Sequence, residues 1–495
     1  MKTAEEYVAS LRARNVRLFI RGKKIDEPVD HPMVAPSVRT IAESYRLAHD
    51  PAHRDVFTAH STLIDATVNR FTHLFGTRDD LLKKLEMQRT LGRLTGTCFQ
   101  RCVGMDAVNA LYNVTFEMDA KLASASRDGA ATPGYHARFV EYLKHVQRDD
   151  LVLCGAMTDP KGDRRKAPAD QPDQYLRVVS RTAKSIVVRG AKMHQTGVVN
   201  SHEVVVMPGR ALSEHEGEFA VAFAIPVDTK GITLIYGRQP SDDRRNGCDL
   251  DQGNARYGGQ EAVVLFEDVE VPMENVFMLG ETSWASPLVE YFAGHHRASY
   301  GGCKPGNADV LIGAAALVAR LNGTEKASHI RDKLVEMVHL AETMHAGGLA
   351  ASTKCQKTPS GTMMVDPLLA NVCKQNVTRF PYEITRLAED IAGGLLVSLP
   401  AAEDLDHPEY GALLKKYITG ARGTAEDRAR VLRLIENMTL GATAVAIRTE
   451  SMHGAGSPQA QRVRIEAQAD FDGKIQDAAR ISGAHAPTLE RPEKR

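Results

Sequence analysis

Two segments far apart in this chain carry side chains suited to holding an iron–sulfur cluster. The first contributes Cys98 and Cys102, and the second, residues 295–304, contributes His296 and Cys303. A cubane cluster needs four soft or borderline donors, of which thiolates are the usual ones and a histidine can be one. We therefore predict a [4Fe–4S] cluster held by three thiolates and one imidazole. An iron held by imidazole is a candidate for opening a coordination position to a substrate oxygen.

The sequence around Cys98 and Cys102 leaves a second interpretation open. Apolar residues recur at spacings of three and four, which predicts a single helix with both sulfurs on one face, about one turn apart. The members of this stripe are Met87, Leu91, Leu94, Cys98, Cys102 and Met105. Ordinary core packing explains the same stripe, because buried cysteine behaves as a small apolar residue. Periodicity alone does not separate ligands from core.

The second segment is unusual for a core helix. His296, Tyr300 and Cys303 share one helical face at positions i, i+4 and i+7, with polar neighbours that are costly to bury. Seven residues of straight helix span about 10 Å, which is long for two ligands of one cluster. Gly301–Gly302 and Pro305 weaken helix propensity, so we expect a bend or a helix end here.

Composition excludes several classes of protein. The chain has 495 residues, with 62 basic and 62 acidic side chains and 43% hydrophobic residues. No long basic run indicates a nucleic-acid partner, and no apolar run approaches the ~20 residues of a membrane span. The N-terminus lacks the hydrophobic region of a signal peptide. Seven scattered cysteines fit a reducing compartment. We therefore expect a cytoplasmic protein.

The order of sequence patterns predicts an α+β protein in three parts. Residues 1–150 have helical patterns, including a helix over 39–45, and form an N-terminal helical domain. Residues 151–285 form a middle antiparallel β-barrel or sandwich, and 286–495 form a helical bundle with a polar tail from 486. Short β-branched runs identify the strands, at 185–189, 202–207, 219–225 and 262–266. Helices, strands and then a bundle is the layout of the acyl-CoA dehydrogenase fold.

Three glycine-containing segments are candidates for cofactor contact, each with a structural alternative. Residues 154–164 have the small side chains of a turn that admits a planar ring or a phosphate, or they link two domains. The pair Gly393–Gly394, expected within a helix, permits close approach to a cofactor or tight helix packing. Residues 453–458 either end a helix or cover a cofactor. No GxGxxG motif follows a strand, so a Rossmann site is not expected.

Two glutamates are candidates for acid–base chemistry. Glu261 begins a strand on the face that carries Val263 and Leu265. A carboxylate on an apolar face has a raised pKa and can act as a base near neutral pH. Alternatively, Glu261 ends the strand at a solvent edge. Glu450, which follows the last helical stripe, allows the same two interpretations.

Taken together, these motifs resemble the 4-hydroxyphenylacetate 3-hydroxylase family. The resemblance covers nearly the whole chain and includes Cys98-x3-Cys102, the cassette from His296 to Lys304, residues 157–164 and residues 190–197. It is strongest to the iron–sulfur flavoprotein branch of that family, because the flavin monooxygenases of the family lack the cysteine and histidine set. The sequence does not depart from that branch at the four ligand positions.

The resemblance implies a function and a set of residue roles. The implied activity is radical dehydration of 4-hydroxybutyryl-CoA to crotonyl-CoA with FAD and a [4Fe–4S] cluster, together with vinylacetyl-CoA isomerisation, in a homotetramer. The implied catalytic residues are His296, Tyr300, Glu261, Glu450 and Lys304. Those implied to contact FAD are Gln100, Met157, Thr158, Asp163, Arg164, Thr196, Asp390, Gly393, Gly394, Ala455 and Gly456. The Asp390–Gly394 segment is expected to reach the FAD of a neighbouring subunit.

The chemistry of this implied reaction explains why it needs both FAD and an iron–sulfur cluster. The thioester of 4-hydroxybutyryl-CoA acidifies the C2 proton but not the C3 proton that dehydration must remove. One-electron oxidation of the C2 anion makes the C3 proton acidic, and the 4-hydroxyl can then leave toward an iron. Two other functions remain open from the sequence. They are a reduced-flavin-dependent aromatic hydroxylase and a non-catalytic redox protein that carries a cluster.

Overall fold

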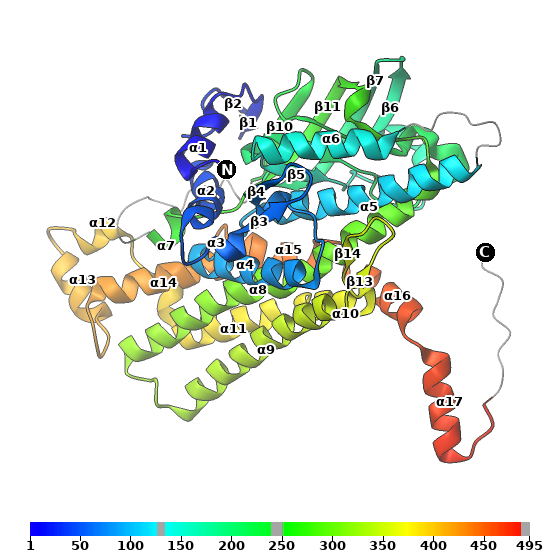
Figure 1. The fold of residues 1–495 in the computed structure, drawn as a ribbon. Coiled ribbons are helices and arrows are strands. Elements are labelled where there is room, and N and C mark those ends of the chain that lie inside the picture. Colours follow the sequence, from blue (N-terminus) through cyan, green and yellow to red (C-terminus); the bar gives the residue numbers. More distant parts are fainter. Residues whose placement is uncertain (126–133, 239–249, 251, 487–495) are drawn as a thin grey trace.

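The computed structural model describes residues 1–125, 134–238, 250 and 252–486. Most of the predicted polar tail, from residue 487 onward, lies outside the described residues. Helices dominate both ends of the chain, and most strands of its two larger β-sheets lie between them in sequence (Figure 1). The mixed helical and β-sheet class predicted from the sequence is confirmed.

The N-terminal region combines helices with short strands. Its helices are α1 Ala4–Arg12, α2 Ala35–His49, α3 Arg54–Phe57, α4 Arg78–Thr95, α5 Cys102–Ala125 and α6 Tyr135–Arg148. Its strands are β1 Leu18–Ile20, β2 Lys23–Ile25, β3 Thr58–Ser61 and β4 Ala66–Asn69. The helix expected over 39–45 is α2. Strand β1 joins the main sheet beside a strand from the middle of the chain, so the first 150 residues contribute to the β-sheet region as well.

The strand region forms two sheets. Its strands are β5 Leu153–Ala156, β6 Arg177–Arg181, β7 Ser185–Thr196, β8 Glu203–Val206, β9 Val221–Pro226, β10 Ile232–Tyr236, β11 Glu261–Pro272 and β12 Val276–Leu279, with the short helix α7 Gln252–Ala255 before β11. The strand orders are β2-β1-β10-β11-β7-β6 and β12-β9-β8-β5. The expectation of antiparallel pairing in the middle region was wrong for β5–β8, which are parallel. Strand β1, from the N-terminal region, also pairs parallel with β10. Long intervening chain between these partners permits parallel pairing.

The two sheets pack face to face over a shared core. Alternate side chains of β7 and β11 meet those of β8 and β9, and Phe223 and Phe266 contact edge to face with ring centroids 6.3 Å apart. This is the period-two burial expected of strands with one covered face. All four predicted strand runs lie within or beside observed strands. The boundaries at residues 150 and 285 stay predictions.

The C-terminal region is helical and centres on α8. Its helices are α8 Ala285–Asn322, α9 Ser328–Thr353, α10 Pro367–Val377, α11 Phe380–Ala392, α12 Ala402–Leu405, α13 Gly411–Ile418, α14 Ala425–Thr439, α15 Glu450–His453, α16 Pro458–Gln468 and α17 Phe471–Ser482. The two-residue strands β13 Gln356–Lys357 and β14 Met363–Met364 form a small hairpin. Helix α8 packs against α4 and α9, α16 packs against α10, and α17 extends away from the body (Figure 1).

The expected helix end near Pro305 was wrong, because α8 runs through it, and the alternative of a bend stays a prediction. Proline has no N–H, so the carbonyl of Gly301, four residues earlier, loses its helical partner. The Nδ1 of His345 donates to that carbonyl at 2.8 Å and replaces the missing bond. Gly301 itself serves close helix packing: a Cβ there would lie 2.6 Å from the Cα of Gly348 on α9.

Candidate functional site

The segment between α4 and α5 carries the first two cysteines. The prediction that Cys98 and Cys102 share one helix was wrong. Helix α4 stops at Thr95 because Gly96 adopts a left-handed conformation with φ 64°, and α5 begins at Cys102. Residues 97–101 therefore form a non-helical crossing between the two helices.

Buried side chains hold this crossing in place. Phe99 packs against Phe71, with ring centroids 5.9 Å apart. The Arg101 guanidinium lies between the rings of Tyr45 and Phe71 and donates to the hydroxyl of Ser44 at 2.9 Å. Cationic and aromatic groups stacked in this way stabilise a buried segment without regular secondary structure. The two cysteines are therefore presented by a fixed loop and by the start of the next helix.

A carboxylate joins the cysteine segment to α8. Glu450, at the start of α15, accepts a hydrogen bond from the Cys98 thiol at 3.5 Å. Its other oxygen lies 3.0 Å from the ammonium of Lys304. That ammonium also donates at 2.7 Å to the carbonyl of Ala446, in the π-helical turn Val445–Thr449. Burial opposes the charge of Lys304, but Glu450 and the nearby cysteines raise its pKa above the ordinary value.

Glu261 lies within electrostatic reach of Glu450. It begins β11 opposite Thr196, the last residue of β7, whose hydroxyl lies 2.7 and 2.8 Å from the two carboxylate oxygens. Burial and the charge of Glu450 raise the pKa of Glu261 well above its ordinary value, although Thr196 and Lys304 act in the opposite direction. Glu261 is half-buried and its pKa is raised as expected, and its role as a base stays a prediction.

The three predicted cysteine ligands are free thiols within electrostatic reach of one another. Burial raises the pKa of Cys303 to about 11 and raises the pKa values of Cys98 and Cys102 well above the usual range. The charges of neighbouring cysteines add to this effect. Thiols in such surroundings become thiolates only when a cation stabilises them, and coordinated iron does so.

His296 makes a contact that sequence reasoning missed. Its Nδ1 lies 2.8 Å from the carboxylate of Asp106 on α5, which in turn lies 2.6 Å from the ammonium of Lys84 on α4. Although burial alone would raise it, Lys84 and His296 lower the pKa of Asp106 to about 2. The sequence did contain a signal for this contact, since Asp106 and Lys84 each lie in an apolar helical stretch. Charged side chains are buried in such stretches only when they are paired.

Tyr300 lies at the centre of the polar groups. Its ring is 5.2 Å from that of His296, and the ammonium groups of Lys304 and Lys374 lie 5.2 and 4.8 Å from its centroid. Lys374, on α10, also donates to the carbonyl of Ser451 at 2.6 Å. Burial and the charges of Lys304 and Arg297 lower the pKa of Lys374 to about 7. Lys374 was not predicted, because only tertiary packing places α10 beside α8.

Beside Cys98, three buried side chains have polar atoms that lack a hydrogen-bond partner among the described residues. They are Thr97, Gln100 and Gln260. Gln100 donates through Nε2 to the carbonyl of Gly258 at 3.0 Å, but its Oε1 is unsatisfied. Unsatisfied buried polar groups cost free energy, so a cluster of them indicates a missing polar partner. The donors and acceptors present suit a planar polar ring.

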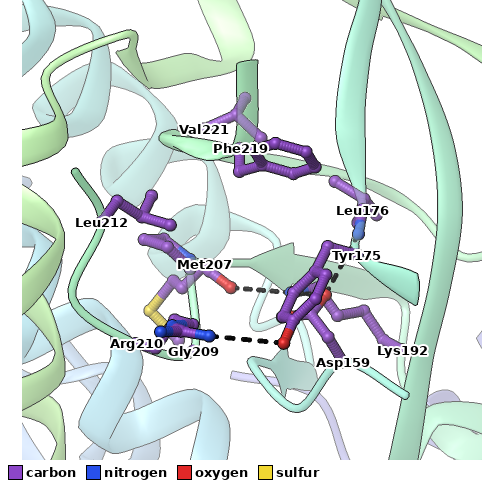
Figure 2. A pocket seen from close by; sticks show the side chains of 11 residues that line it. Asp159, Tyr175, Leu176, Lys192, Met207, Gly209, Arg210, Leu212, Phe219 and Val221 are labelled. Carbon is purple, nitrogen blue, oxygen red and sulfur yellow. Dashed lines mark hydrogen bonds and ion pairs between the residues drawn. The ribbon is translucent and has the colours of Figure 1, made fainter. Parts of the chain in front are cut away.

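The loop that carries Met157 and Thr158 is braced from the strand region. Thr158 accepts a hydrogen bond from the backbone of Met193 at 2.7 Å, and Lys192 donates to the carbonyl of Met157 at 3.0 Å. Figure 2 shows Lys192 beside Asp159, 2.8 Å away, and donating to the carbonyl of Met207. This buried pair lines a small pocket and fixes the loop.

Other residues predicted to contact FAD are at least partly exposed. Asp163 pairs with Arg165, and Arg164 is exposed. The expectation that Gly393–Gly394 lie within a helix was wrong, because α11 ends at Ala392 and Gly393 has φ 76°. A Cβ on either glycine would meet nothing within 4 Å among the described residues. Their contact with FAD stays a prediction.

The Ala455–Gly456 turn is fixed beside the central groups by an arginine on α8. The guanidinium of Arg297 donates to the carbonyl of Ala455 at 3.0 Å and to the side chain of Asn371 at 2.8 Å. Ala455 itself has φ 55°, an uncommon conformation for a residue with a Cβ. The segment ends α15, as one of its two sequence interpretations expects, and it lies against the Tyr300 hydroxyl. Its FAD contact also stays a prediction.

The predicted ligands Cys98, Cys102, Cys303 and His296 suit a cluster of several irons better than a single metal ion. Within the described part of the chain, no three His, Cys, Asp or Glu side chains converge as ligands of a single ion. The ligands of a cubane cluster bind different irons and need not converge in that way. Three free thiols, one buried and two half-buried, and an imidazole held by a carboxylate at its other nitrogen fit a cluster.

Comparison with known proteins identifies the family of this chain. The family described as 4-hydroxyphenylacetate 3-hydroxylase matches residues 3–278 with its N-terminal part and residues 285–483 with its C-terminal part. The chain therefore belongs to the 4-hydroxyphenylacetate 3-hydroxylase family. Within the described residues, no helix is both long and apolar enough to cross a membrane.

Within this family, the chain is similar to dehydratases that act on a CoA ester. It is 51% identical to 4-hydroxybutyryl-CoA dehydratase/vinylacetyl-CoA-Delta-isomerase of Clostridium aminobutyricum, over 98% of this chain and 99% of that protein. The structure of an archaeal 4-hydroxybutyryl-CoA dehydratase from N. maritimus, described as oxygen tolerant, matches with a TM-score of 0.94 and 49% identity, over 100% of this chain and 97% of that one.

Similarity to the hydroxylases of the family is lower. The oxygenase component of 4-hydroxyphenylacetate 3-monooxygenase from Thermus thermophilus is 28% identical, over 89% of this chain and 88% of that protein. A structure of such an oxygenase component, complexed with FAD and 4-hydroxyphenylacetate, matches with a TM-score of 0.85 and 24% identity, over 97% of this chain and 99% of that one. The latter likeness concerns the fold.

Proposed function

We propose that this protein dehydrates 4-hydroxybutyryl-CoA to crotonyl-CoA, and isomerises vinylacetyl-CoA to crotonyl-CoA, by a radical mechanism that uses FAD and a [4Fe–4S] cluster. The observation that carries the proposal is the convergence of Cys98, Cys303, Lys304 and Glu450 beside Tyr300 and His296. The 51% identity to the clostridial dehydratase over nearly the whole of both chains supports the same substrate.

The cluster is held by Cys98, Cys102, Cys303 and His296 in this proposal. Its support is chemical: the thiols are free, at least half-buried, and close enough that the charges of Cys98 and Cys303 raise the pKa of Cys102. Gln88 also directs an amide N–H at the sulfur of Cys102, 3.6 Å away. Hydrogen bonds of this kind to cysteine sulfur are among the features that set the potential of an iron–sulfur cluster.

FAD binds, in the same proposal, beside Gln100, Met157, Thr158 and Thr196. The unsatisfied side chains of Thr97, Gln100 and Gln260 are the support from this chain, since a flavin ring offers both donors and acceptors. Gly197, next to Thr196, has φ 81°, and a Cβ there would lie 2.8 Å from the carbonyl of Gln100. Glycine at position 197 therefore permits the end of β7 to approach the loop that carries Gln100.

When bound, FAD supplies one-electron transfer and the cluster supplies a Lewis-acidic iron. The chain's own residues supply the proton transfers. Glu261 and Glu450 are half-buried carboxyl groups in different surroundings, one held by a hydroxyl and the other by the ammonium of Lys304. Different surroundings divide acid and base roles between two carboxyl groups. Glu261, Glu450 and His296 are the candidates for the C2 and C3 proton transfers.

Tyr300 is proposed to bind the departing 4-hydroxyl oxygen through its phenol. Burial and the negative charge of Glu450 raise the pKa of Tyr300 well above its ordinary value, so the phenol keeps its proton and is a hydrogen-bond donor. The neighbouring ammonium groups of Lys304 and Lys374 favour negative charge in the same region. Together they orient the substrate's leaving group and stabilise the charge that develops on it.

We further propose that the protein is a homotetramer in the cytoplasm. An acyl-CoA dehydrogenase-like arrangement with FAD at subunit contacts accounts for the exposed Gly393–Gly394 segment, which in a homotetramer reaches the FAD of a neighbour. Six cysteines of the described residues are free, as expected in the cytoplasm. The substrate is an acyl-CoA, and no nucleic-acid or membrane partner is proposed.

The test is an anaerobic assay of the purified protein with 4-hydroxybutyryl-CoA and with vinylacetyl-CoA. The proposal expects crotonyl-CoA from both. An aromatic hydroxylase would instead oxidise 4-hydroxyphenylacetate with reduced FAD and oxygen, and would contain no iron. A non-catalytic redox protein would hold a cluster, and its flavin and cluster spectra would be unchanged by either CoA ester. Either of those results would contradict the proposal.

A further inference from the structure

A buried carboxylate joins three helices directly behind His296. Asp106 lies on α5, Lys84 on α4, and His296 and Ser299 on α8. The Asp106 carboxylate contacts the Lys84 ammonium at 2.6 Å, the His296 Nδ1 at 2.8 Å and the Ser299 hydroxyl at 3.1 Å. Asp106 is fully buried and Lys84 is 2% exposed. Helices α4 and α8 lie side by side at this point (Figure 1).

The position of Lys84 fixes this carboxylate from two directions. Its ammonium donates to Asp106 and, at 3.2 Å, to the backbone carbonyl of His295, the residue before His296. It also lies 4.8 Å from the centroid of the Phe75 ring. A buried ammonium surrounded by a carboxylate, a carbonyl and an aromatic face has little freedom. Lys84 therefore holds both Asp106 and the backbone next to His296.

The contact with Asp106 selects one form of the His296 ring. A carboxylate accepts hydrogen bonds, so Nδ1 must carry the proton, and a neutral imidazole then presents an unprotonated Nε2. Metal-bound histidines commonly donate their second N–H to a carboxylate, which fixes the tautomer, the ring orientation and the donor strength. The Lys84–Asp106 pair gives His296 this arrangement before any metal binds.

We propose that Asp106, held by Lys84, is a positioning residue that keeps Nε2 of His296 directed at the cluster and sets how firmly His296 holds its iron. The inference rests on the proposed function, since it assigns a role toward the proposed cluster. Asp106 acts through His296 and contacts no substrate.

The variants must separate positioning from folding. Asp106→Asn alone leaves Lys84 buried without a counter-charge and can destabilise the chain. The double variant Lys84→Met/Asp106→Asn removes both charges together and serves as the second test. Ser299→Ala is the matched control, because it removes another hydrogen bond to the same carboxylate without touching His296. Each variant is also made in a His296→Cys background, where thiolate replaces imidazole.

The measurements are the rate of iron release to a chelator and the nitrogen hyperfine coupling of the reduced cluster, both on anaerobically purified holoenzyme. We expect Asp106→Asn and the double variant to release iron about 10- to 100-fold faster and to change the coupling. Ser299→Ala should remain close to wild type. In the His296→Cys background, the Asp106 change should not accelerate release.

Wild-type release and coupling in both Asp106 variants would overturn the inference, as would acceleration that persists in the His296→Cys background. The latter result would show that Asp106 only supports the local packing. A wild-type protein without iron would instead overturn the proposed function and this inference with it. The experiment therefore distinguishes a failure of the role assigned to Asp106 from a failure of the proposed function.

Discussion

The hydroxyl of Tyr300 lies against the backbone of Gly454, so closely that a Cβ at position 454 would overlap the phenol oxygen. Gly454 has φ −60° and ψ 140°, a conformation open to any residue. The glycine is thus required by the contact and not by its backbone angles. The turn that ends α15 therefore determines where the Tyr300 hydroxyl lies.

Gly454→Ala should lower dehydratase activity by about 100-fold, because the new methyl group displaces the Tyr300 hydroxyl by a distance that matters for catalysis. Iron and flavin content should stay at wild-type levels. The measurement is turnover with 4-hydroxybutyryl-CoA beside cofactor analysis. Gly313→Ala is the matched control, since a Cβ there meets nothing within 4 Å among the described residues. Full activity in Gly454→Ala would show that the hydroxyl position is unimportant.

Tyr300→Phe removes the hydroxyl and leaves the ring packed between Lys304 and Lys374. We expect the variant to keep FAD and cluster but to lose about 100-fold or more in dehydration, because the phenol binds or protonates the departing oxygen. A packed core tyrosine would instead lose modest stability and little turnover. Anaerobic activity with iron analysis separates these outcomes.

Lys374 gives the protein a predictable dependence of stability on pH. Its pKa is lowered to about 7 in the folded state, from an ordinary value of 10.5, by burial and by Lys304 and Arg297. Between those two values, the unfolded chain binds more protons, so this group makes stability increase as the pH rises from about 7 to 10.5. In Lys374→Met, the midpoint of thermal unfolding should rise less with pH over that range than in the wild type. The same rise in both proteins would contradict the surroundings assigned to Lys374.

Substitution of single cysteines tests which of them are ligands of the cluster. Cys98→Ala, Cys102→Ala and Cys303→Ala should each lose the cluster and dehydration together, because each removes one thiolate ligand. Cys373→Ala is the matched control: this thiol is also buried, and it donates to the carbonyl of Met344 at 3.4 Å. Iron near the wild-type level in any of the three variants would remove that residue from the ligand set.

Much of the fold could be predicted from local pattern. The β-branched runs at 185–189 and 262–266 lie in β7 and β11, and the helix predicted over 39–45 is α2. These predictions depend on periodicity, which a sequence carries directly. The break at Gly96 was missed, because a continuous apolar stripe outweighed a glycine that in fact ends α4.

The remaining errors depended on contacts between distant residues. Pro305 continues a helix because His345, on another helix, binds the carbonyl that proline leaves free. Asp106 and Lys374 reach His296 and Tyr300 only after α5 and α10 pack on α8. A sequence names such residues but not their partners. Cys98, Lys304 and Glu450 were predicted because family motifs already carry the long-range information.

The central claim is that one chain combines a flavin with a cluster held by Cys98, Cys102, Cys303 and His296. The most direct test is the analysis of iron, acid-labile sulfide and flavin in protein purified without oxygen, for wild type and for His296→Cys, with dehydration measured on the same samples. We predict one cluster and one flavin per chain in both, with dehydration in the wild type alone, because thiolate does not yield its iron to substrate. Wild-type protein without iron, or an active His296→Cys enzyme, would contradict the account.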